Sequence, residues 1–376
     1  NQKTGLPNHY LMERDVSAVI NEAQQSTVWR QVTLLIVALD ERYHTVKRTL
    51  SPTVSEWVLY QIGERLGSLL PSNGRLYHTR DSEFVILLVN AMSEEYIPTF
   101  AERISGVMEE QFQFPDYTVN VGCKIGAAVY PDDASTKQML LRNADLALSV
   151  AQKSKEHFAR YEAEMSEVVI EKMELQNSII RALEEQAITE INKQFTLYYQ
   201  PVVQIQEMKD ASVHHRVVGA ESLMRWNHPT RGMIPPGRFI PVAEETGLII
   251  PIGNWALFTA SDQLHAWSQT SLNNIYVSVN LSPRQFRDDY LLSNIERALN
   301  RNEIDPSLLK LEVTEGLVME DPEDSISKLQ AIQKMGITIS IDDFGTGYSS
   351  LNYLKRLPID LLKLDKTFID DVLSNP

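Results

Sequence analysis

Acidic and amide side chains lie at the ends of successive strand-like runs in the second half of the chain. The runs VVGAES, IYVSVN, LKLEVTE and ITISIDD carry, in this order, Glu221, Asn280, Glu312 and the adjacent pair Asp342 and Asp343. Each run is a short apolar strand candidate followed by a helix-like segment, which predicts a parallel β/α barrel whose strand ends gather at one rim. Oxygen ligands of this kind suit Mg²⁺ or Mn²⁺, and two such ions suit phosphoester hydrolysis.

Each of these residues also has an interpretation without a metal. A single Glu or Asn at the end of a strand is more often a cap or a solvated side chain, and Lys363, in the run LLKLD, taken alone is a surface lysine. Adjacent Asp342 and Asp343 would repel each other at the end of an apolar strand unless a cation or hydrogen-bond donors lay nearby. The pattern as a whole therefore favours the metal site.

Length and charge limit the classes of protein to which the chain can belong. It has 376 residues, 43% of them hydrophobic, which predicts two domains. Its net charge of -15 argues against general nucleic-acid binding, so no DNA partner is expected, although a metal site can supply local positive charge for a small phosphate ligand. The single cysteine, Cys123, excludes an intrachain disulfide and is typical of a reducing cytosol. No apolar run approaches the ~20 residues of a membrane span, and a cytoplasmic location is predicted.

The first half of the chain alternates between the two kinds of periodicity. Strand candidates cover residues 34–40, 83–89 and 119–130. Helical patterns cover residues 54–70, 94–111 and 136–153. This alternation predicts a compact α/β sandwich.

A helix without Gly or Pro follows, from Glu162 to about Glu185. Its apolar stripe, broken only by Gln176, consists of Met165, Val169, Met173, Ile180 and Leu183. One interpretation is a helix that packs on its own domain. The other is a rigid connector that carries a signal or pairs with a second copy of the chain.

Several motifs in order resemble two known families. Residues 195–368 resemble an EAL domain, the family of cyclic di-GMP phosphodiesterases, through FTLYYQPVV, GAESLMRWNHPTRGMIPPGRFIPVAEETGLI, VSVNLSPRQF, LEVTE, IDDFGTGYSSLNYLKRLPID and LLKLDKTF. Residues 4–165 resemble a GGDEF domain, the diguanylate cyclase family, through TGLPN, IGAAVYPDD and NADLAL. The resemblance implies an α/β fold: a GGDEF sandwich over residues 1–165, a connector helix over 166–190 and an EAL-type (β/α) TIM-like barrel over 191–376.

The EAL resemblance assigns a role to each residue at the strand ends. It implies that Glu221 is a metal ligand, although the signature reads Glu221-Ser222-Leu223. We expect the Ser222 hydroxyl to bond to local backbone and leave the geometry intact. The further implied metal ligands are Asn280, Glu312, Asp342 and, for the second ion, Asp343.

The resemblance also assigns roles outside the ligand set. It implies that Lys363 holds the attacking water, that Arg225 grips a phosphate and that Gln200, in YYQP, lines the ligand pocket. It makes residues 345–350 the loop that couples the metal site to dimerisation, with Glu315 holding that loop by hydrogen bonds.

The implied reaction is hydrolysis of cyclic di-GMP to linear pGpG with two Mg²⁺ or Mn²⁺ ions. The alternative is a receptor or adaptor that binds cyclic di-GMP and signals to a protein partner without turnover. Family members of that kind usually lack the signature Glu, the Asn or an Asp, and this chain has all of them. A homodimer through the EAL domain and the connector helix is expected.

The first domain departs from its family where a cyclase would act. The signature region reads RDSEF at residues 80–84, so side chains replace two glycines that allow close approach to GTP phosphates. Ala38 stands where the family has a metal-binding Asp. Diguanylate cyclase activity is therefore not expected, and a regulatory or dimerisation module is.

Both ends of the chain suggest a piece of a longer protein. Asn1 begins without an initiator Met, and Pro376 follows soon after the last strand candidate. Six barrel strands can be counted where eight are usual, so an open barrel, inactive alone, is expected. A membrane anchor, if the longer protein has one, is expected upstream.

Overall fold

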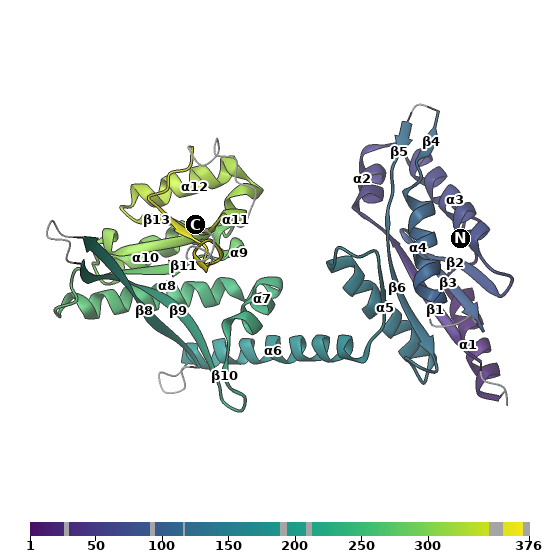
Figure 1. Ribbon diagram of the computed structural model, residues 1–376, viewed down its shortest axis with the longest axis horizontal. Helices are drawn as coiled ribbons and strands as arrows, with labels where there is room; N and C mark the ends of the chain where they lie inside the picture. Colours follow the sequence, from purple (N-terminus) through teal and green to yellow (C-terminus); the bar gives the residue numbers. More distant parts are fainter. Residues whose placement is uncertain are drawn as a thin grey trace. The chain divides into compact units, whose positions relative to one another are not determined.

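The computed structural model divides into two compact units, Asn1–Glu171 and Lys172–Pro376. Figure 1 shows both units, with labels on most of their helices and strands. The division falls inside helix α6 (Ala163–Ile188), and the domain limits given above stay predictions. The structure describes residues 1–25, 30–90, 95–115, 117–188, 194–207, 213–345 and 356–370.

The first unit is built on a five-stranded sheet of order β2-β3-β1-β6-β7. All eight residues of β1 are buried, because helices cover both faces of the sheet. Strand β1 pairs antiparallel with β3 and β6, and β7 is parallel to β6. The strands are β1 (Val32–Leu39), β2 (Gly74–Arg80), β3 (Glu83–Val89), β6 (Cys123–Tyr130), β7 (Phe158–Arg160) and a separate hairpin of β4 (Phe112–Phe114) and β5 (Tyr117–Val119).

Two helix layers complete this unit. Apolar side chains of α3 and α4 form one core cluster with the sheet, and those of α1 and α5 form the other. The predicted α/β sandwich is confirmed. The helices are α1 (His9–Gln25), α2 (Glu41–Thr49), α3 (Pro52–Leu69), α4 (Tyr96–Glu109) and α5 (Lys137–Lys153).

The second unit contains a curved sheet that forms half of a barrel. Its order is β10-β9-β11-β12-β13-β14, with β8 also paired to β9. Strands β9, β11, β12, β13 and β14 are parallel, so their carboxyl ends share one rim, as predicted. The strands are β8 (Phe195–Glu207), β9 (Val213–His228), β10 (Gly232–Ile234), β11 (Tyr276–Asn280), β12 (Leu309–Thr314), β13 (Thr338–Phe344) and β14 (Leu361–Leu364).

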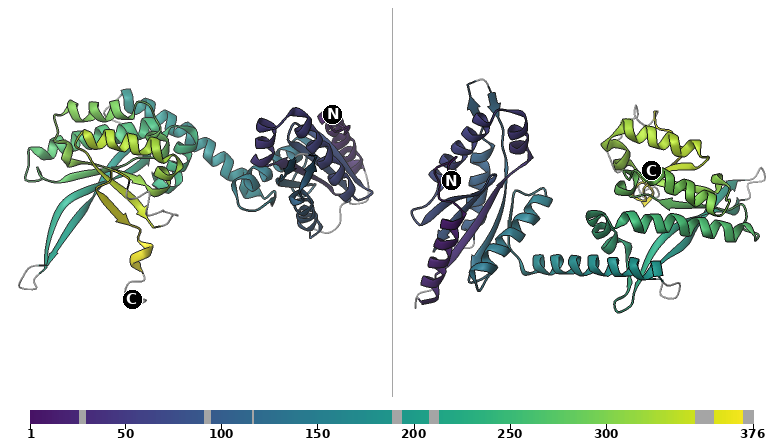
Figure 2. Two further views of the ribbon diagram at one scale, coloured as in Figure 1. Left: turned by 90° about the horizontal axis from the view of Figure 1, so that it is seen from above. Right: turned by 180° about the vertical axis from the view of Figure 1, so that it is seen from behind.

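The first strand of this sheet departs from the predicted strand-then-helix pattern. Strand β8 is antiparallel to β9, and the two form a ribbon of 13 and 16 residues. Figure 2 shows this ribbon extending away from the helices of the unit. The segment between the strands, residues 208–212, is too short for a crossover, which needs about a dozen residues between parallel strands.

Helices pack on the outer face of the parallel strands. Side chains of α8, α10 and α12 form one core with β11, β12 and β13. Among the helices in the described part of the chain, none is long and apolar enough to cross a membrane. The helices are α7 (Pro236–Thr246), α8 (Ile249–Ser268), α9 (Pro283–Phe286), α10 (Leu291–Arg301), the 3-10 turn η1 (Pro306–Leu308), α11 (Glu315–Glu320), α12 (Pro322–Lys334) and α14 (Thr367–Asp370).

Helix α6 packs through a different stripe from the one identified in the sequence. Leu175, Ile179 and Ala182 are buried in a core cluster of the second unit. In the predicted stripe, Met173 is exposed by 59% and Ile180 by 36%, whereas Leu183 packs against the same core cluster. Part of α6 is therefore an ordinary packed helix, while Val169 and Met173 stay exposed among the residues that the structure describes.

Candidate active site

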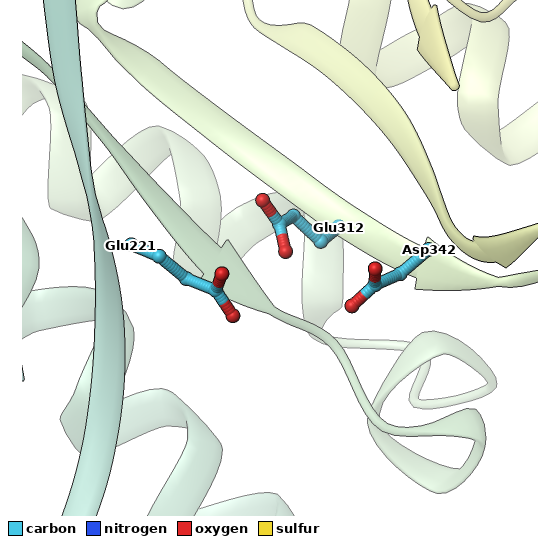
Figure 3. Close-up of side chains that lie close together, drawn as sticks. All are labelled: Glu221, Glu312 and Asp342. Atoms are coloured by element: carbon cyan, nitrogen blue, oxygen red, sulfur yellow. The ribbon is translucent and has the colours of Figure 1, made fainter. Parts of the chain in front are cut away.

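Three carboxylates from three strands meet at the carboxyl rim of the half-barrel. Oxygen atoms of Glu221, Glu312 and Asp342 all lie within 4.8 Å of one another. Figure 3 shows the three side chains pointing toward a common centre. Glu312 is the most enclosed, with 5% of its surface exposed. The sequence prediction that these residues gather at one rim is met by this geometry.

The register of the parallel strands explains why the side chains converge. Asn280 on β11 pairs with Glu312 on β12, so both side chains stand on the same face at the same height. Ser278, two residues earlier on β11, pairs with Glu221. The Asn280 side chain reaches back across this step, and its Nδ2 donates to Glu221 Oε1 at 3.1 Å.

Lys363 on β14 places a positive charge inside the cluster. Its Nζ donates to Glu221 Oε2 at 3.1 Å and to Glu312 Oε2 at 2.5 Å, and lies 3.2 Å from Asp342 Oδ1. Burial by itself would lower the pKa of this ammonium, but the hydrogen bond to Glu312 and the charges of Glu312, Glu221 and Asp342 raise it. Lys363 is therefore a permanent cation at this rim.

The same environment changes the acidity of the carboxylates. Burial raises the pKa of Glu312, against the lowering effect of the Lys363 hydrogen bond and charge. The pKa of Asp343 is also raised, first by burial and then by the charge of Asp342. This direction agrees with the repulsion expected between the two adjacent aspartates.

Asp343 stands apart from the three clustered carboxylates. It is exposed, and its φ of 52° is in the left-handed region that non-glycine residues rarely adopt. The pairing of β13 with β14 shifts register between Ile341 and Phe344, across this position. The backbone is therefore bent here, and Asp343 is presented toward solvent while Asp342 turns into the cluster.

The remaining predicted residues lie around this centre. Gln200 is exposed on β8, in register with Glu221. The Arg225 guanidinium donates from Nη1 to the Met224 carbonyl at 2.9 Å. Glu315 is buried, and its Oε2 accepts from the Gly345 backbone N–H at 3.0 Å. Residues 346–350 of the predicted coupling loop lie outside the described residues.

Ser222 makes a different hydrogen bond from the one predicted. Its Oγ donates to the Ser278 carbonyl at 2.7 Å, on the neighbouring strand rather than in its own segment. Ser222 is buried and paired with Val279 of β11, so the backbone of that strand is the nearest acceptor. The hydroxyl thus ties β9 to β11 one residue after Glu221.

A cavity of about 260 Å³ opens beside the carboxylate cluster. It lies between the strand ends and helices α7, α8 and α9, and its lining includes Arg225, Asn280 and Glu312. Sequence reasoning did not find one member of this lining, Glu244 on α7. Burial raises the pKa of the Glu244 carboxyl. In the sequence this residue has only the helical spacing of the run FIPVAEE, which does not distinguish a pocket-facing from a solvent-facing glutamate.

Comparison with known proteins gives two family matches. The EAL domain family matches residues 180–376, and the diguanylate cyclase GGDEF domain family matches residues 1–158. The S helix-GGDEF-EAL structure of Vibrio cholerae LapD bound to c-di-GMP superposes with a TM-score of 0.54 at 16% identity, over 98% of this chain and 82% of that one. At this identity, the likeness concerns the fold alone.

Curated relatives extend over almost the whole of this chain. The bifunctional diguanylate cyclase/cyclic di-GMP phosphodiesterase MucR of Pseudomonas aeruginosa is 34% identical over 370 residues, 98% of this chain and 51% of MucR. The cyclic di-GMP phosphodiesterase PdeR of Escherichia coli is 30% identical over 375 residues, 99% of this chain and 53% of PdeR. The chain thus spans about half the length of these relatives.

Proposed function

We propose that this chain, which belongs to the EAL domain family and carries a GGDEF domain before its EAL domain, hydrolyses cyclic di-GMP to linear pGpG. One observation carries the proposal: Glu221, Glu312 and Asp342 converge at one rim together with Lys363. The two relatives MucR and PdeR, both named as cyclic di-GMP phosphodiesterases, support the choice of substrate. A receptor without turnover has no need for this convergence of four charged side chains.

The donor set at this rim fits divalent cations. Carboxylate oxygens with one amide oxygen are the ligands that Mg²⁺ and Mn²⁺ prefer, and the Lys363 ammonium among the carboxylates indicates a position that attracts positive charge. We propose that two such ions are held by Glu221, Asn280, Glu312, Asp342 and Asp343. When bound, they supply Lewis-acid activation of the attacking water and of the leaving oxygen.

The other residues bind and orient the reactants. Lys363 stays protonated because its pKa is raised, so it can donate a hydrogen bond to the attacking water but cannot accept its proton. Arg225 forms no ion pair with any described residue, which leaves its guanidinium for a substrate phosphate. Gln200, exposed opposite Glu221, is proposed to contact the substrate above the metal site.

We propose that the GGDEF domain does not condense GTP and has a regulatory role. The charged side chains at its signature are all paired: Arg80 Nη1 lies 3.1 Å from Glu83 Oε2 within the signature, and Lys3 and Lys47 from outside it pair with Asp81. These two lysines lower the pKa of Asp81 to about 2. With its charge held by the two lysines, Asp81 acts by its bulk: Arg80 and Asp81 place side chains at the turn between β2 and β3, where the family's glycines let phosphates approach.

The direct test is product analysis with the full-length protein. Cyclic di-GMP incubated with the protein and Mn²⁺ or Mg²⁺ should give pGpG, separated by chromatography. Glu221→Ala should abolish the product, while Glu245→Gln, an exposed glutamate of α7, serves as the matched control and should leave it unchanged. An E221A variant as active as its parent would remove Glu221 from the proposed ligand set.

A further inference from the structure

Three charged residues line the cavity beside the carboxylate cluster, and two of them, Arg225 and Glu244, form no ion pair with each other. Among the described residues, the Arg225 guanidinium donates a hydrogen bond to the Met224 carbonyl alone, and it lies over the ring of Tyr198, 5.4 Å from its centroid. In the described parts of the chain, the Glu244 carboxylate accepts no hydrogen bond and forms no ion pair. A ligand that brings a negative group to Arg225 and hydrogen-bond donors to Glu244 satisfies both.

The surroundings of Glu244 make its lack of a partner unfavourable for the protein alone. Leu197, Pro236, Ile240 and Ile249 line the same cavity. An ionised carboxylate that loses water against such side chains, and gains no donor in return, costs free energy in the folded protein. Glu244 is only half-buried and lines an open cavity, so its carboxylate can accept hydrogen bonds from a ligand that enters there.

The shape and chemistry of the cavity fit a planar base attached to a phosphate. Aliphatic walls can cover the two faces of a ring, and a carboxylate at the edge accepts from adjacent N–H groups. Guanine presents two such donors on its Watson–Crick edge, N1–H and N2–H. Adenine presents an acceptor, N1, beside its amino group, so a carboxylate repels one of the two facing atoms.

We propose that Glu244 selects guanine: its carboxylate accepts hydrogen bonds from N1–H and N2–H of one guanine of cyclic di-GMP while Arg225 holds the adjoining phosphate. This inference rests on the proposed function and adds to it a residue that determines which base is accepted. Glu244 lies in the lining of the same cavity as Glu312 and Asn280, so a base held there is connected to the metal rim through its own phosphate.

Binding and kinetics of the full-length protein with two substrates test this role. Dissociation constants for cyclic di-GMP and cyclic di-AMP, and kcat and KM for both, are measured for the parent, Glu244→Gln and the control Glu245→Gln. Loss of two hydrogen bonds to a charged acceptor should weaken cyclic di-GMP binding about ten- to hundredfold. Cyclic di-AMP binding should stay the same or improve. The effect should lie in KM, because Glu244 is not among the clustered carboxylates.

The melting temperature of the protein without nucleotide separates recognition from a structural role. Because the Glu244 carboxylate has no partner among the described residues, E244Q should melt at or above the parent temperature. If E244Q fails to fold, Glu244→Asp keeps the charge with a shorter reach and should lose part of the preference for guanine.

The outcomes distinguish this inference from the proposed function. A parent that hydrolyses cyclic di-GMP, with an E244Q variant that keeps the parent ratio of affinities for the two nucleotides, overturns the role of Glu244 and leaves the function standing. Equal losses for both nucleotides also overturn it, since they indicate a general defect. A parent that neither binds nor hydrolyses cyclic di-GMP refutes the function and this inference with it.

Discussion

Replacing Lys363 by Met should destabilise the metal-free protein by about 3 kcal/mol at neutral pH. Carboxylate oxygens of Glu221, Glu312 and Asp342 lie within 4.8 Å of one another, and Lys363 Nζ is within 3.2 Å of all three residues. Two unit charges at such a separation repel by about 3.5 kcal/mol at an effective dielectric constant near 20. In the metal-free variant without the ammonium, a proton taken up by Glu312, the most buried of the three, relieves this repulsion.

The loss of stability in K363M should therefore increase as the pH rises. In the parent, burial raises the pKa of Glu312 and the Lys363 hydrogen bond and charge partly oppose that rise. K363M lacks this hydrogen bond and this charge, so the pKa of Glu312 in the folded variant rises further. A carboxyl with a raised pKa contributes its stability below the unfolded-state value and loses it as pH rises through the folded-state value. The K363M deficit should be small in acid and grow toward neutral pH.

Thermal unfolding of the full-length protein measures this effect in EDTA and in Mn²⁺. Because the chain has two compact units, the melting curve can contain two transitions. The transition whose midpoint rises with Mn²⁺ is assigned to the unit that contains the carboxylate cluster. Lys334→Met, an exposed lysine at the end of α12, is the matched control. K363M in EDTA should melt well below both proteins, and Mn²⁺ should restore most of the difference. A K363M variant as stable as K334M in EDTA across this pH range contradicts the reasoning.

Three further predictions follow from the proposals. Ca²⁺ should inhibit turnover supported by Mn²⁺, because its longer bonds and looser coordination suit the rim less well; undiminished activity in excess Ca²⁺ argues against the metal site. Residues 1–165 should neither make cyclic di-GMP nor bind GTP tightly in calorimetry, since side chains fill the signature turn; detected synthesis refutes this. Met173→Glu should shift the protein toward a monomer in light scattering, if the exposed stripe of α6 pairs two copies; an unchanged mass excludes this face as the dimer contact.

The clustered carboxylates could be predicted from the sequence because they depend on one regular feature. Adjacent parallel strands have their carboxyl ends at the same rim of the sheet. A carboxylate at the end of each apolar run can therefore be assigned to that rim without knowledge of the side-chain packing. The orientation of β8 could not be predicted in the same way. Its apolar pattern is the same in either direction, and only the five-residue segment 208–212 excludes a parallel crossover.

Two further features could not be predicted from the sequence: which face of α6 is buried, and that Glu244 lines the cavity. Helix α6 carries two apolar stripes at helical spacing, one through Val169 and Met173 and one through Leu175 and Ile179, and periodicity alone cannot say which one meets a core. Glu244 is one of two adjacent glutamates in α7. Its neighbour Glu245 is exposed, and only the packing of α7 over the strand ends sets Glu244 into the cavity.

Lys363 also determines how folding and metal binding are related in this protein. Three carboxylates at one rim without a cation would make folding dependent on metal, as in small domains whose ligands cannot converge until the ion arrives. The ammonium of Lys363 offsets this repulsion before any metal binds. The central strand β12, which carries Glu312, is also hydrogen-bonded to β11 on one side and to β13 on the other. The EAL domain can therefore fold first and take up the proposed ions afterwards. This order allows the rim to lose and regain metal without unfolding, and it predicts that EDTA abolishes activity reversibly while the parent protein stays folded.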